Sequence, residues 1–446
     1  MSWPHRRHCL IAAWFVAAVF GVVILSGCSG GTAAPGPAPV DWSGTQGPSG
    51  NATKFQVLHV FSENQSGTDP SADAELIGGV VYGTTFRGGT GRNVCGCGIV
   101  YAIDGSGQER TVHAFSGAKH AKHPADGDGA YPLSGLVEFN GSLYGATSAG
   151  GDFDPSAACP HGDTPGCGTV YSIDSSGKEH IIYRFQGGSD GIWPAGNLIK
   201  FLGKLYGVTI YGGGQGGYTC WAACGTVFAI NAAGKETVVH RFTGGADGAL
   251  PQAGLAVING NLYGTTSQGG NGSAPCADCG TVFAIDRSGN LRTLYAFSGS
   301  YDGGNPQSNL VQVGDSIYGT SYSGGNRGFC GTIFSIGSSG GERTAWTFGC
   351  APDDGKNPRG TLVVRRGVIY GATQYGGAYG CRFGWGCGTI FAFNPKTSQE
   401  SLVESLESAD GTQPVGLSIA DGVLYGAAYQ GGGGLRGNGT VFSIVP

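Results

Sequence analysis

A three-residue motif, an aliphatic residue followed by Tyr and Gly, recurs seven times and limits the possible folds more than any other feature. Its tyrosines are Tyr82, Tyr144, Tyr206, Tyr263, Tyr318, Tyr370 and Tyr425. They lie 62, 62, 57, 55, 52 and 55 residues apart. A regular internal period of this size is typical of repeat architectures, in which each repeat is one supersecondary unit. The intervals suit a blade of four strands with its loops.

The second repeat shows the parts of the unit. Leu136–Phe139 alternates apolar and polar residues, Asn140 with the following Gly is a hairpin turn, and Ser142–Ser148 reads as the next strand. A glycine-rich loop leads to a third alternating strand, Gly168–Asp174, and a turn leads to a fourth, His180–Phe185. The chain contains 88 glycines, but they recur periodically among Tyr, Phe, Val and Ile. This combination predicts short strands and tight turns instead of disorder.

The phase of the repeats predicts how the array ends. The last repeat stops after its third strand, Gly439–Ile444, while an unassigned strand, Phe55–Phe61, precedes the first repeat. That strand resembles the fourth strands, such as Arg292–Phe297. We therefore predict an all-β fold, a seven-bladed β-propeller of four-stranded blades over 54–446, closed by the N-terminal strand that completes the last blade. The alternative, an open β-solenoid, predicts no missing strand and expects polar capping repeats.

The N-terminus predicts export. A basic stretch precedes the apolar run from Cys9 to Leu25, and Leu25-Ser26-Gly27-Cys28 matches a lipobox. We predict a signal peptide over 1–27, lipidation of Cys28, and a flexible Gly/Pro/Ala tether over 28–53. A plain signal peptide or a membrane span is the alternative. The expected location is the cell envelope, lipid-anchored and extracytoplasmic. Ser29 in place of Asp favours the outer membrane if the host is Gram-negative.

The repeat resembles two known patterns. An apolar strand, Asn-Gly, Leu-Tyr-Gly, Gly-Gly and a strand ending in Asp are similar to kelch-type propeller repeats, although the kelch Trp is missing. The fuller pattern, with Cys-Gly-Thr-Val-Phe-Ala-Ile-Asp and Asp-Gly-x-x-Pro, resembles the GloVer tandem-repeat family from Lys54 to Pro446. That resemblance implies surface export through varied anchors and no established activity. The first repeat departs from it by lacking the Asp-Gly-x-x-Pro loop, and the seventh by lacking cysteines.

Twelve cysteines remain after Cys9 in the signal and the lipidated Cys28 are set aside. An even number in an exported protein predicts disulfides. The expected pairs are Cys95/Cys97, Cys159/Cys167, Cys220/Cys224, Cys276/Cys279, Cys381/Cys387 and Cys330/Cys350. Cys330 lies in the loop between the second and third strands of its repeat, and Cys350 lies in the loop between the fourth strand and the first strand of the next repeat. These second–third and fourth–first loops share one face of a propeller. The first pair would close a strained ring. The alternative is zinc, since Cys276 and Cys279 have zinc-like spacing, but no matching second pair follows.

Residues peculiar to single repeats are the functional candidates, because residues shared by all repeats solve the same packing problem. The ligand-binding candidates on the cysteine-bearing face are Tyr131, Trp193, Tyr211, Trp221, Arg382 and Trp385. The ends of the second strands add Phe86, Tyr322, Tyr375 and Tyr429. Aromatic side chains on disulfide-pinned loops suit stacking on sugar rings or anchoring of a protein partner. The alternative is that they only pack over the glycine-rich loops.

Catalysis has weaker support. The candidates are Asp152, Asp154, His161 and Asp163 in repeat two, with His120 and His123 in the preceding loop. Spacing alone does not place two carboxylates at a glycosidase separation, and no hydrolase, zinc-protease or phosphate-loop motif is present. The Asp-Gly pairs of the fourth–first loops are expected to be turns, and a Ca²⁺-binding ring of acids is the alternative.

These observations predict an exported, lipid-anchored recognition or scaffold module. Its loop face would bind a surface glycan or an envelope protein. We expect no cofactor and no resident metal. The formal charge of −5, without a Lys/Arg cluster in the repeats, excludes the electrostatic footprint of a nucleic-acid-binding protein. The alternative function is an extracytoplasmic carbohydrate-active hydrolase or lyase.

Overall fold

The structure, a computed structural model, describes most of the repeat region. It covers residues 55–62, 67–89, 96–117, 127–151, 159, 166–214, 220, 223–270, 279–325, 330–337, 340–351, 354–377, 381, 385–433 and 437–446. The predicted signal peptide (1–27) and tether (28–53) lie outside these residues. Every helix or strand element within them is a β-strand. Among the described residues, no helix is long and apolar enough to cross a membrane.

Each repeat supplies strands to four positions, and we number the blades I to VII in chain order. The innermost position holds β2 (Gly67–Pro70) with β3 (Glu75–Ile77), β7 (Ala130–Pro132) with β8 (Val137–Phe139), β12 (Gly191–Phe201), β16 (Ala256–Ile258), β20 (Gly304–Pro306) with β21 (Val311–Val313), β25 (Gly355–Arg365) and β29 (Thr412–Ala420). The second position holds β4 (Val80–Gly88), β9 (Ser142–Ala149), β13 (Lys204–Gly212), β17 (Asn261–Thr266), β22 (Ser316–Ser323), β26 (Val368–Gly376) and β30 (Val423–Gln430).

The two outer positions are equally regular. The third holds β5 (Ile99–Ile103), β10 (Thr169–Ile173), β14 (Thr226–Ile230), β18 (Thr281–Ile285), β23 (Thr332–Ile336), β27 (Thr389–Asn394) and β31 (Thr440–Ile444). The fourth holds β6 (Glu109–Ala114), β11 (Glu179–Arg184), β15 (Glu236–Arg241), β19 (Leu291–Ala296), β24 (Glu342–Thr347), β28 (Gln399–Ser405) and β1 (Phe55–Val60).

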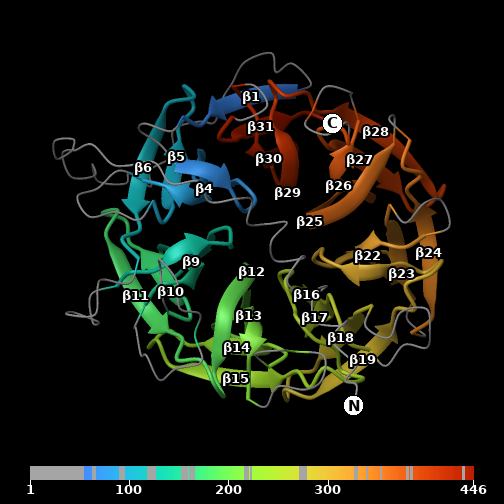
Figure 1. Ribbon diagram of the computed structural model, residues 1–446, viewed down its shortest axis with the longest axis horizontal. Helices are drawn as coiled ribbons and strands as arrows, with labels where there is room; N and C mark the ends of the chain where they lie inside the picture. The colour runs from blue at the N-terminus through green and yellow to red at the C-terminus, as the bar shows by residue number, and fades with distance from the viewer. Residues whose placement is uncertain are drawn as a thin grey trace, which may run out of the picture. The chain divides into compact units, whose positions relative to one another are not determined.

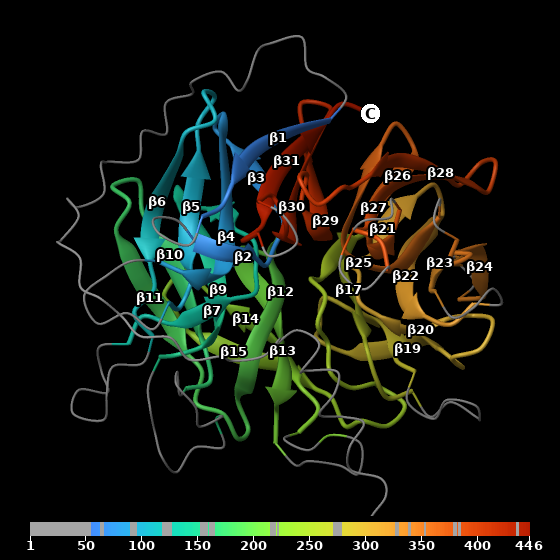
Figure 2. The ribbon, with the colours of Figure 1, turned by 45° about the horizontal axis from the view of Figure 1, so that its top comes forward.

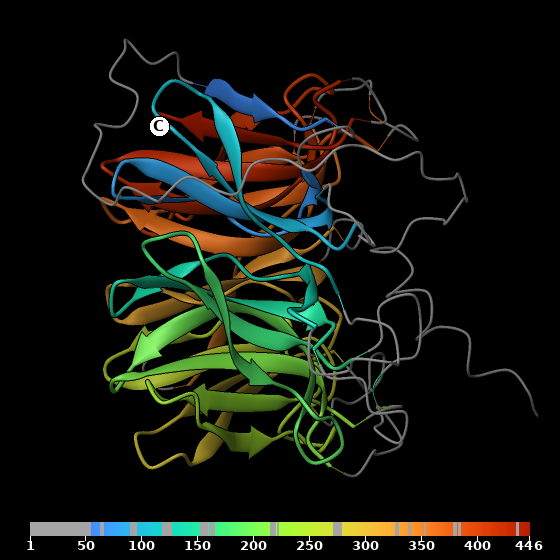
Figure 3. The same ribbon diagram turned by 90° about the vertical axis from the view of Figure 1, so that its left-hand side faces the viewer.

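The blades form a ring in which the first strands lie innermost and the fourth strands outermost (Figure 1). Hydrogen bonding follows the chain order within a blade, as in the antiparallel sheet β12-β13-β14-β15. Seen edge-on, the strands run between the two faces of the ring (Figure 3). The predicted all-β, seven-bladed propeller is therefore confirmed.

The N-terminal strand closes the ring as predicted. Strand β1 pairs antiparallel with β31, Phe55 opposite Ile444 and Val60 opposite Thr440, and so completes blade VII (Figure 2). Directly after β1, the Phe61 ring packs edge to face on Tyr101 of blade I, with centroids 5.1 Å apart. The first segment of the repeat region thus finishes the last blade and joins it to the first, which leaves no open sheet edge between them.

The Gly of the repeated motif is required by an aromatic ring lying on it. In blade III a Cβ atom at Gly207 would collide with Phe228 of the third strand, and the equivalent glycines face an aromatic ring in the same way. Phe228 is fully buried. The ring of Phe185, which directly follows the fourth strand of blade II, packs edge to face on Phe228 with centroids 5.1 Å apart. This favourable aromatic geometry is repeated between neighbouring blades. The motif therefore encodes the contact between blades.

The loops separate onto two faces. The turns between first and second strands and between third and fourth strands form the hairpin face. Asp174 stabilises one of them, accepting hydrogen bonds from the backbone N–H groups of Ser176 (2.9 Å) and Lys178 (3.1 Å) as predicted. The second–third and fourth–first loops form the opposite face, which we call the cysteine face.

Two details of the predicted repeat need correction. The innermost strand begins earlier than predicted, at the loop proline, so that Ala130–Pro132 precedes Val137–Phe139. The first repeat also keeps most of the loop it was expected to lack. Its Gly67 and Pro70 pair with β4 as Gly191 and Pro194 pair with β13 in blade III, and only the Asp of the pattern is replaced.

Candidate functional site

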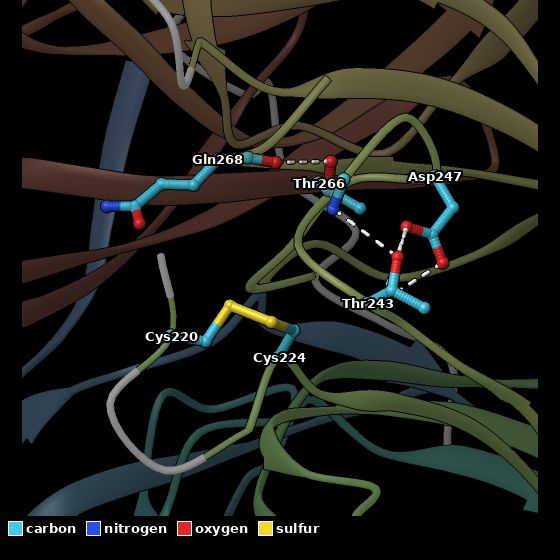
Figure 4. The surroundings of a disulfide bond; sticks show 7 residues. Cys220, Cys224, Thr243, Asp247, Thr266 and Gln268 are labelled. Atoms are coloured by element: carbon cyan, nitrogen blue, oxygen red, sulfur yellow. Dashed lines mark hydrogen bonds between the residues drawn. A yellow bond between two sulfur atoms is a disulfide. The ribbon is translucent and has the colours of Figure 1, made fainter. Parts of the chain in front are cut away.

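Disulfides hold loops of the cysteine face. The bonds join Cys159 to Cys167, Cys220 to Cys224 (Figure 4), Cys330 to Cys350 and Cys381 to Cys387. All four were predicted, including the third, which crosses from one loop type to the other. Cys97 and Cys279 are disulfide-bonded as well, while their predicted partners Cys95 and Cys276 lie outside the described residues. Such bonds indicate an oxidising, extracytoplasmic environment.

The Asp of the fourth–first loop acts as a turn residue. The Asp247 carboxylate accepts hydrogen bonds from the Thr243 backbone N–H (3.0 Å) and hydroxyl (Figure 4). It also lies 3.1 Å from His240 Nε2. Burial alone would raise the pKa of Asp247, but these hydrogen bonds hold the pKa below its ordinary value. Equivalent bonds occur at Asp128, Asp190 and Asp302. Within the described part of the chain, no three His, Cys, Asp or Glu side chains converge as metal ligands would.

The residue before each loop proline occupies the same unusual backbone conformation in all seven blades. These residues form the axial ring: Asp69, Tyr131, Trp193, Leu250, Asn305, Asn357 and Gln413, with φ between 55° and 61°. That left-handed region is unfavourable for a non-glycine residue. Each backbone N–H donates a hydrogen bond of 2.8–3.0 Å to a carbonyl of the preceding blade, which in six of the seven cases belongs to a cysteine. The backbone therefore fixes seven equivalent positions on the innermost strands.

One side of the axial ring is aromatic and apolar. Tyr131 stacks on Phe86 of the preceding blade, with centroids 4.8 Å apart, and Trp193 packs edge to face on Tyr211 at 5.4 Å. Leu250 continues this surface on blade IV and is buried. We call these five residues the aromatic arc. Tyr131, Trp193 and Tyr211 are half-buried, so each retains some solvent-accessible surface.

The opposite side of the ring is rich in side-chain amides. Gln374 receives a hydrogen bond from the Tyr322 hydroxyl (2.9 Å) and donates one to Gln413 Oε1 (3.2 Å). Asn357 donates to the Tyr322 carbonyl at 2.9 Å, and Asn305 lies on the next blade at the equivalent ring position. We call Asn305, Asn357, Gln374 and Gln413 the amide arc. It spans blades V to VII and faces blades I to III across the ring (Figure 1).

Arg359 joins the amide arc. Arg359 directly follows Pro358 on β25, and its positive charge acts on three tyrosines around it. Burial raises the pKa of Tyr322 to about 12, and the Arg359 charge partly opposes that rise. Burial likewise raises the pKa of Tyr375, again against Arg359. The tyrosines are therefore neutral hydroxyl groups at neutral pH.

The junction of blades VII and I adds an ion pair. Arg87 lies 3.7 Å from the Asp69 carboxylate. Burial raises the pKa of Asp69 to about 6, and Arg87 opposes the rise. Tyr429 lies beside both; burial raises its pKa to about 12, with Asp69 adding to the rise and Arg87 and Arg359 opposing it.

A buried carboxyl group ties three blades together further along the innermost strands. Asn197 Nδ2 of blade III donates to Asp73 Oδ2 of blade I at 3.0 Å, and the Thr361 side chain of blade VI also hydrogen-bonds Asp73. Burial raises the pKa of Asp73 to about 7. Burial and the neighbouring Asp73 charge raise the pKa of Glu75 to about 7 as well. These groups link non-adjacent blades near the ring axis.

The predicted binding residues have mixed outcomes. Tyr131, Trp193 and Tyr211 lie in the aromatic arc. Trp385 is 57% exposed and packs edge to face on Tyr375 at 5.2 Å, beside the amide arc. Trp221 and Arg382 lie outside the described residues. Phe86 was expected to be exposed, but it is only 1% exposed because the Tyr131 ring covers it.

The predicted catalytic residues all fall outside the described part of the chain: Asp152, Asp154, His161, Asp163, His120 and His123. Sequence reasoning missed Arg359 and the amide arc as a group. Tyr301, 74% exposed on a fourth–first loop, lies at the outer rim of the ring, where its carbonyl accepts a hydrogen bond from Thr344 of β24. A comparison of the residue after each loop proline would have found Arg359. Those residues are Ser71, Leu133, Ala195, Gln252, Gln307, Arg359 and Val415, and only one is charged.

The family model of the Gloeobacter/Verrucomicrobia repeat matches residues 47–221, 157–274 and 222–442, which together span most of the chain. The chain belongs to this repeat family. The resemblance drawn from the repeated pattern is therefore confirmed, and the family repeat here builds a seven-bladed propeller. None of the curated proteins compared with the chain matches it.

Solved structures with a similar fold are distant. The tricorn protease is 14% identical with a TM-score of 0.40, and the match covers 80% of this chain and 29% of that one. A luciferin-regenerating enzyme is 12% identical with a TM-score of 0.41, covering 69% and 88%. A puromycin hydrolase is 10% identical with a TM-score of 0.45, covering 83% and 52%. The chain thus spans less than a third of the first and about half of the last.

Proposed function

We propose that the protein is a surface recognition module that binds a glycan at the axial ring on its cysteine face. The observation that carries the proposal is the change of side-chain chemistry around one structurally uniform ring. The same backbone position presents aromatic residues on one side, Tyr131 and Trp193, and amides on the other, Asn357 and Gln413.

This division suits a sugar. A pyranose ring has an apolar C–H face, which packs well on aromatic rings, and hydroxyl groups that both donate and accept hydrogen bonds. Asn and Gln side chains offer both donors and acceptors, so each amide can satisfy a hydroxyl in either role. Sites that combine an aromatic surface with a few placed polar groups are typical of small-ligand recognition.

The disulfides support the proposal by fixing the ring. The carbonyls that hold Trp193, Leu250, Asn357 and Gln413 belong to Cys167, Cys224, Cys330 and Cys387, each of which is disulfide-bonded. A ring held in advance loses less conformational entropy on binding. The cross-blade hydrogen bonds therefore couple the loop disulfides to the position of the binding residues.

A glycan array and isothermal titration with the purified protein test the proposal. We expect saturable binding of at least one glycan, a tenfold or greater loss in Trp193→Ala, and a similar loss in Gln413→Ala. Tyr301→Ala is the matched control, because Tyr301 is a highly exposed aromatic residue away from the ring. Unchanged binding in both ring variants, or no glycan binding at all, contradicts the proposal.

The same samples separate binding from catalysis. Release of reducing ends or unsaturated sugars, abolished by Asp154→Ala or His161→Ala, would instead support the hydrolase or lyase alternative. We expect retention of the glycan without turnover.

We also propose that Cys28 carries the lipid that tethers the propeller to the envelope, as the lipobox predicts. Metabolic labelling with a radioactive fatty acid tests this. Label should appear in the wild-type protein and be absent from Cys28→Ser, and equal labelling of both would contradict it.

A further inference from the structure

We infer that the recognised glycan carries a carboxylate, which Arg359 binds while the sugar contacts the two arcs. The inference rests on the proposed function and names the chemical class of its ligand. It starts from the state of the Arg359 side chain. Arg359 is half-buried, yet no described residue accepts a hydrogen bond from its guanidinium or forms an ion pair with it.

Two other half-buried arginines among the described residues have acceptors. Arg184 donates to the Gly127 carbonyl at 3.3 Å and Arg365 to the Pro446 carbonyl at 2.8 Å. Exposed arginines such as Arg366 are open to solvent. A guanidinium carries five N–H donors and cannot lose its charge, so partial burial without an acceptor is unfavourable. Arg359 is therefore a positive charge on the innermost strand of blade VI for which the described residues supply no anionic partner.

Asp69, an acidic side chain in the same region, does not pair with Arg359. The charges of Asp69 and Arg359 both shift the pKa of Tyr429, which places the three side chains close together. Asp69, however, forms its ion pair with Arg87 at 3.7 Å, and Arg87 is the cation that lowers its pKa. Among the described residues, Asp69 therefore pairs with Arg87 and not with Arg359.

The surroundings of Arg359 favour a carboxylate attached to a sugar. A planar guanidinium matches a planar carboxylate through two parallel hydrogen bonds. Tyr322 and Tyr375 remain neutral hydroxyl groups, and Gln374 and Gln413 add neutral amides, so among the described residues of the amide arc these side chains bring no charge that competes with Arg359. One fixed cation among neutral polar groups suits a singly charged sugar acid.

Binding of polygalacturonate tests the inference, because its fully methyl-esterified form has the same sugar backbone without the charge. We expect the purified protein to bind the free acid at least tenfold more tightly than the ester. Arg359→Gln should abolish that preference and Arg359→Lys should keep part of it. Arg366→Gln, which removes one exposed charge, should leave it unchanged. Thermal unfolding of each variant establishes that it is folded.

The outcomes distinguish the inference from the proposal beneath it. Equal binding of acid and ester, a preference that survives Arg359→Gln, or tighter binding of dextran sulfate than of polygalacturonate overturns the carboxylate. In each of those cases loss of glycan binding in Trp193→Ala still upholds the ring as the site. If no glycan binds the wild-type protein, the proposed function itself fails.

Discussion

Replacing Asp73 by Asn should make the propeller more stable at alkaline pH and less sensitive to pH. Asp73 is fully buried among blades I, III and VI, and burial raises its pKa to about 7 from an ordinary value of 3.8. The folded chain therefore binds a proton that the unfolded chain has released. Stability from this group is fully present below pH 3.8 and is lost as the pH rises through 7.

The magnitude follows from that difference. A pKa change of about 3 units corresponds to about 4 kcal/mol in the free energy of unfolding, of which about 2 to 3 kcal/mol falls between pH 5 and pH 8. Asn removes the titration but keeps the hydrogen bonds. Its oxygen can accept from Asn197 Nδ2, and its amide N–H can donate to Thr361 Oγ1. The side chain of residue 73 occupies the space that a Cβ atom at Gly416 would fill, which is why Gly416 has to be a glycine. Asn has about the size of Asp and fits the same space.

Urea denaturation at pH 5 and pH 8 measures the effect. Wild type should lose about 2 to 3 kcal/mol more than Asp73→Asn between the two pH values. The other carboxyls with raised pKa values remain in both proteins. The Asp73 charge contributes to the raised pKa of Glu75, so removing it lowers that pKa and adds to the smaller pH dependence of Asp73→Asn. Asp315→Asn, which removes an exposed carboxylate, is the control and should follow wild type. Identical pH dependence in wild type and Asp73→Asn would refute the reasoning.

Three further predictions concern stability. Tyr101→Phe and Tyr171→Phe should each raise the free energy of unfolding by about 1 to 2 kcal/mol in thermal or urea unfolding, because the two hydroxyls are buried without a partner; a loss of stability would show that they are satisfied. Gly319→Ala should cost about 2 to 3 kcal/mol, since its Cβ atom would collide with Phe334, whereas Gly341→Ala meets open space and should be near neutral. Removing the Cys330–Cys350 disulfide, whose residues are 20 apart, should lower the free energy of unfolding by about 3 kcal/mol. Removing Cys220–Cys224, whose residues are 4 apart, should lower it by about 2 kcal/mol, because a shorter loop restricts the unfolded chain less. The reverse order in paired Ser variants would contradict this chain-entropy account.

The fold could be predicted from the sequence because the same packing problem is solved seven times. The missing strand after Ile444 and the extra strand at Phe55 are visible in the phase of the repeats, and β1 pairs with β31 accordingly. The Cys330–Cys350 bond also followed, because propeller topology places the two loop types on one face. Because seven repeats share one pattern of strands, the strand positions can be recognised even where a single repeat is ambiguous.

The site was only partly predictable because its members are distant in sequence. Tyr131 and Trp193 stood out as unusual residues before a proline, but Arg359 and Gln374 each look ordinary within their own repeats. Their relation appears only when the blades are closed into a ring, which brings Tyr322 to Gln374 and Gln374 to Gln413. Likewise, the bond from Asn197 to Asp73 joins residues 124 positions apart, which no local pattern indicates.

The axial ring also explains why one position of a strict repeat tolerates six different residue types in seven blades. At Gly207 the side-chain position itself is occupied by Phe228, so nothing but glycine fits. At Trp193 the structural requirement falls on the backbone, through its positive φ and its N–H bond to the Cys167 carbonyl, and the side chain contributes nothing to either. At such a position the fold depends on the backbone and not on the type of side chain. The side chain can therefore change to one that binds a ligand without loss of the fold. Family members should therefore differ most at the axial ring while keeping the glycines of the repeated motif.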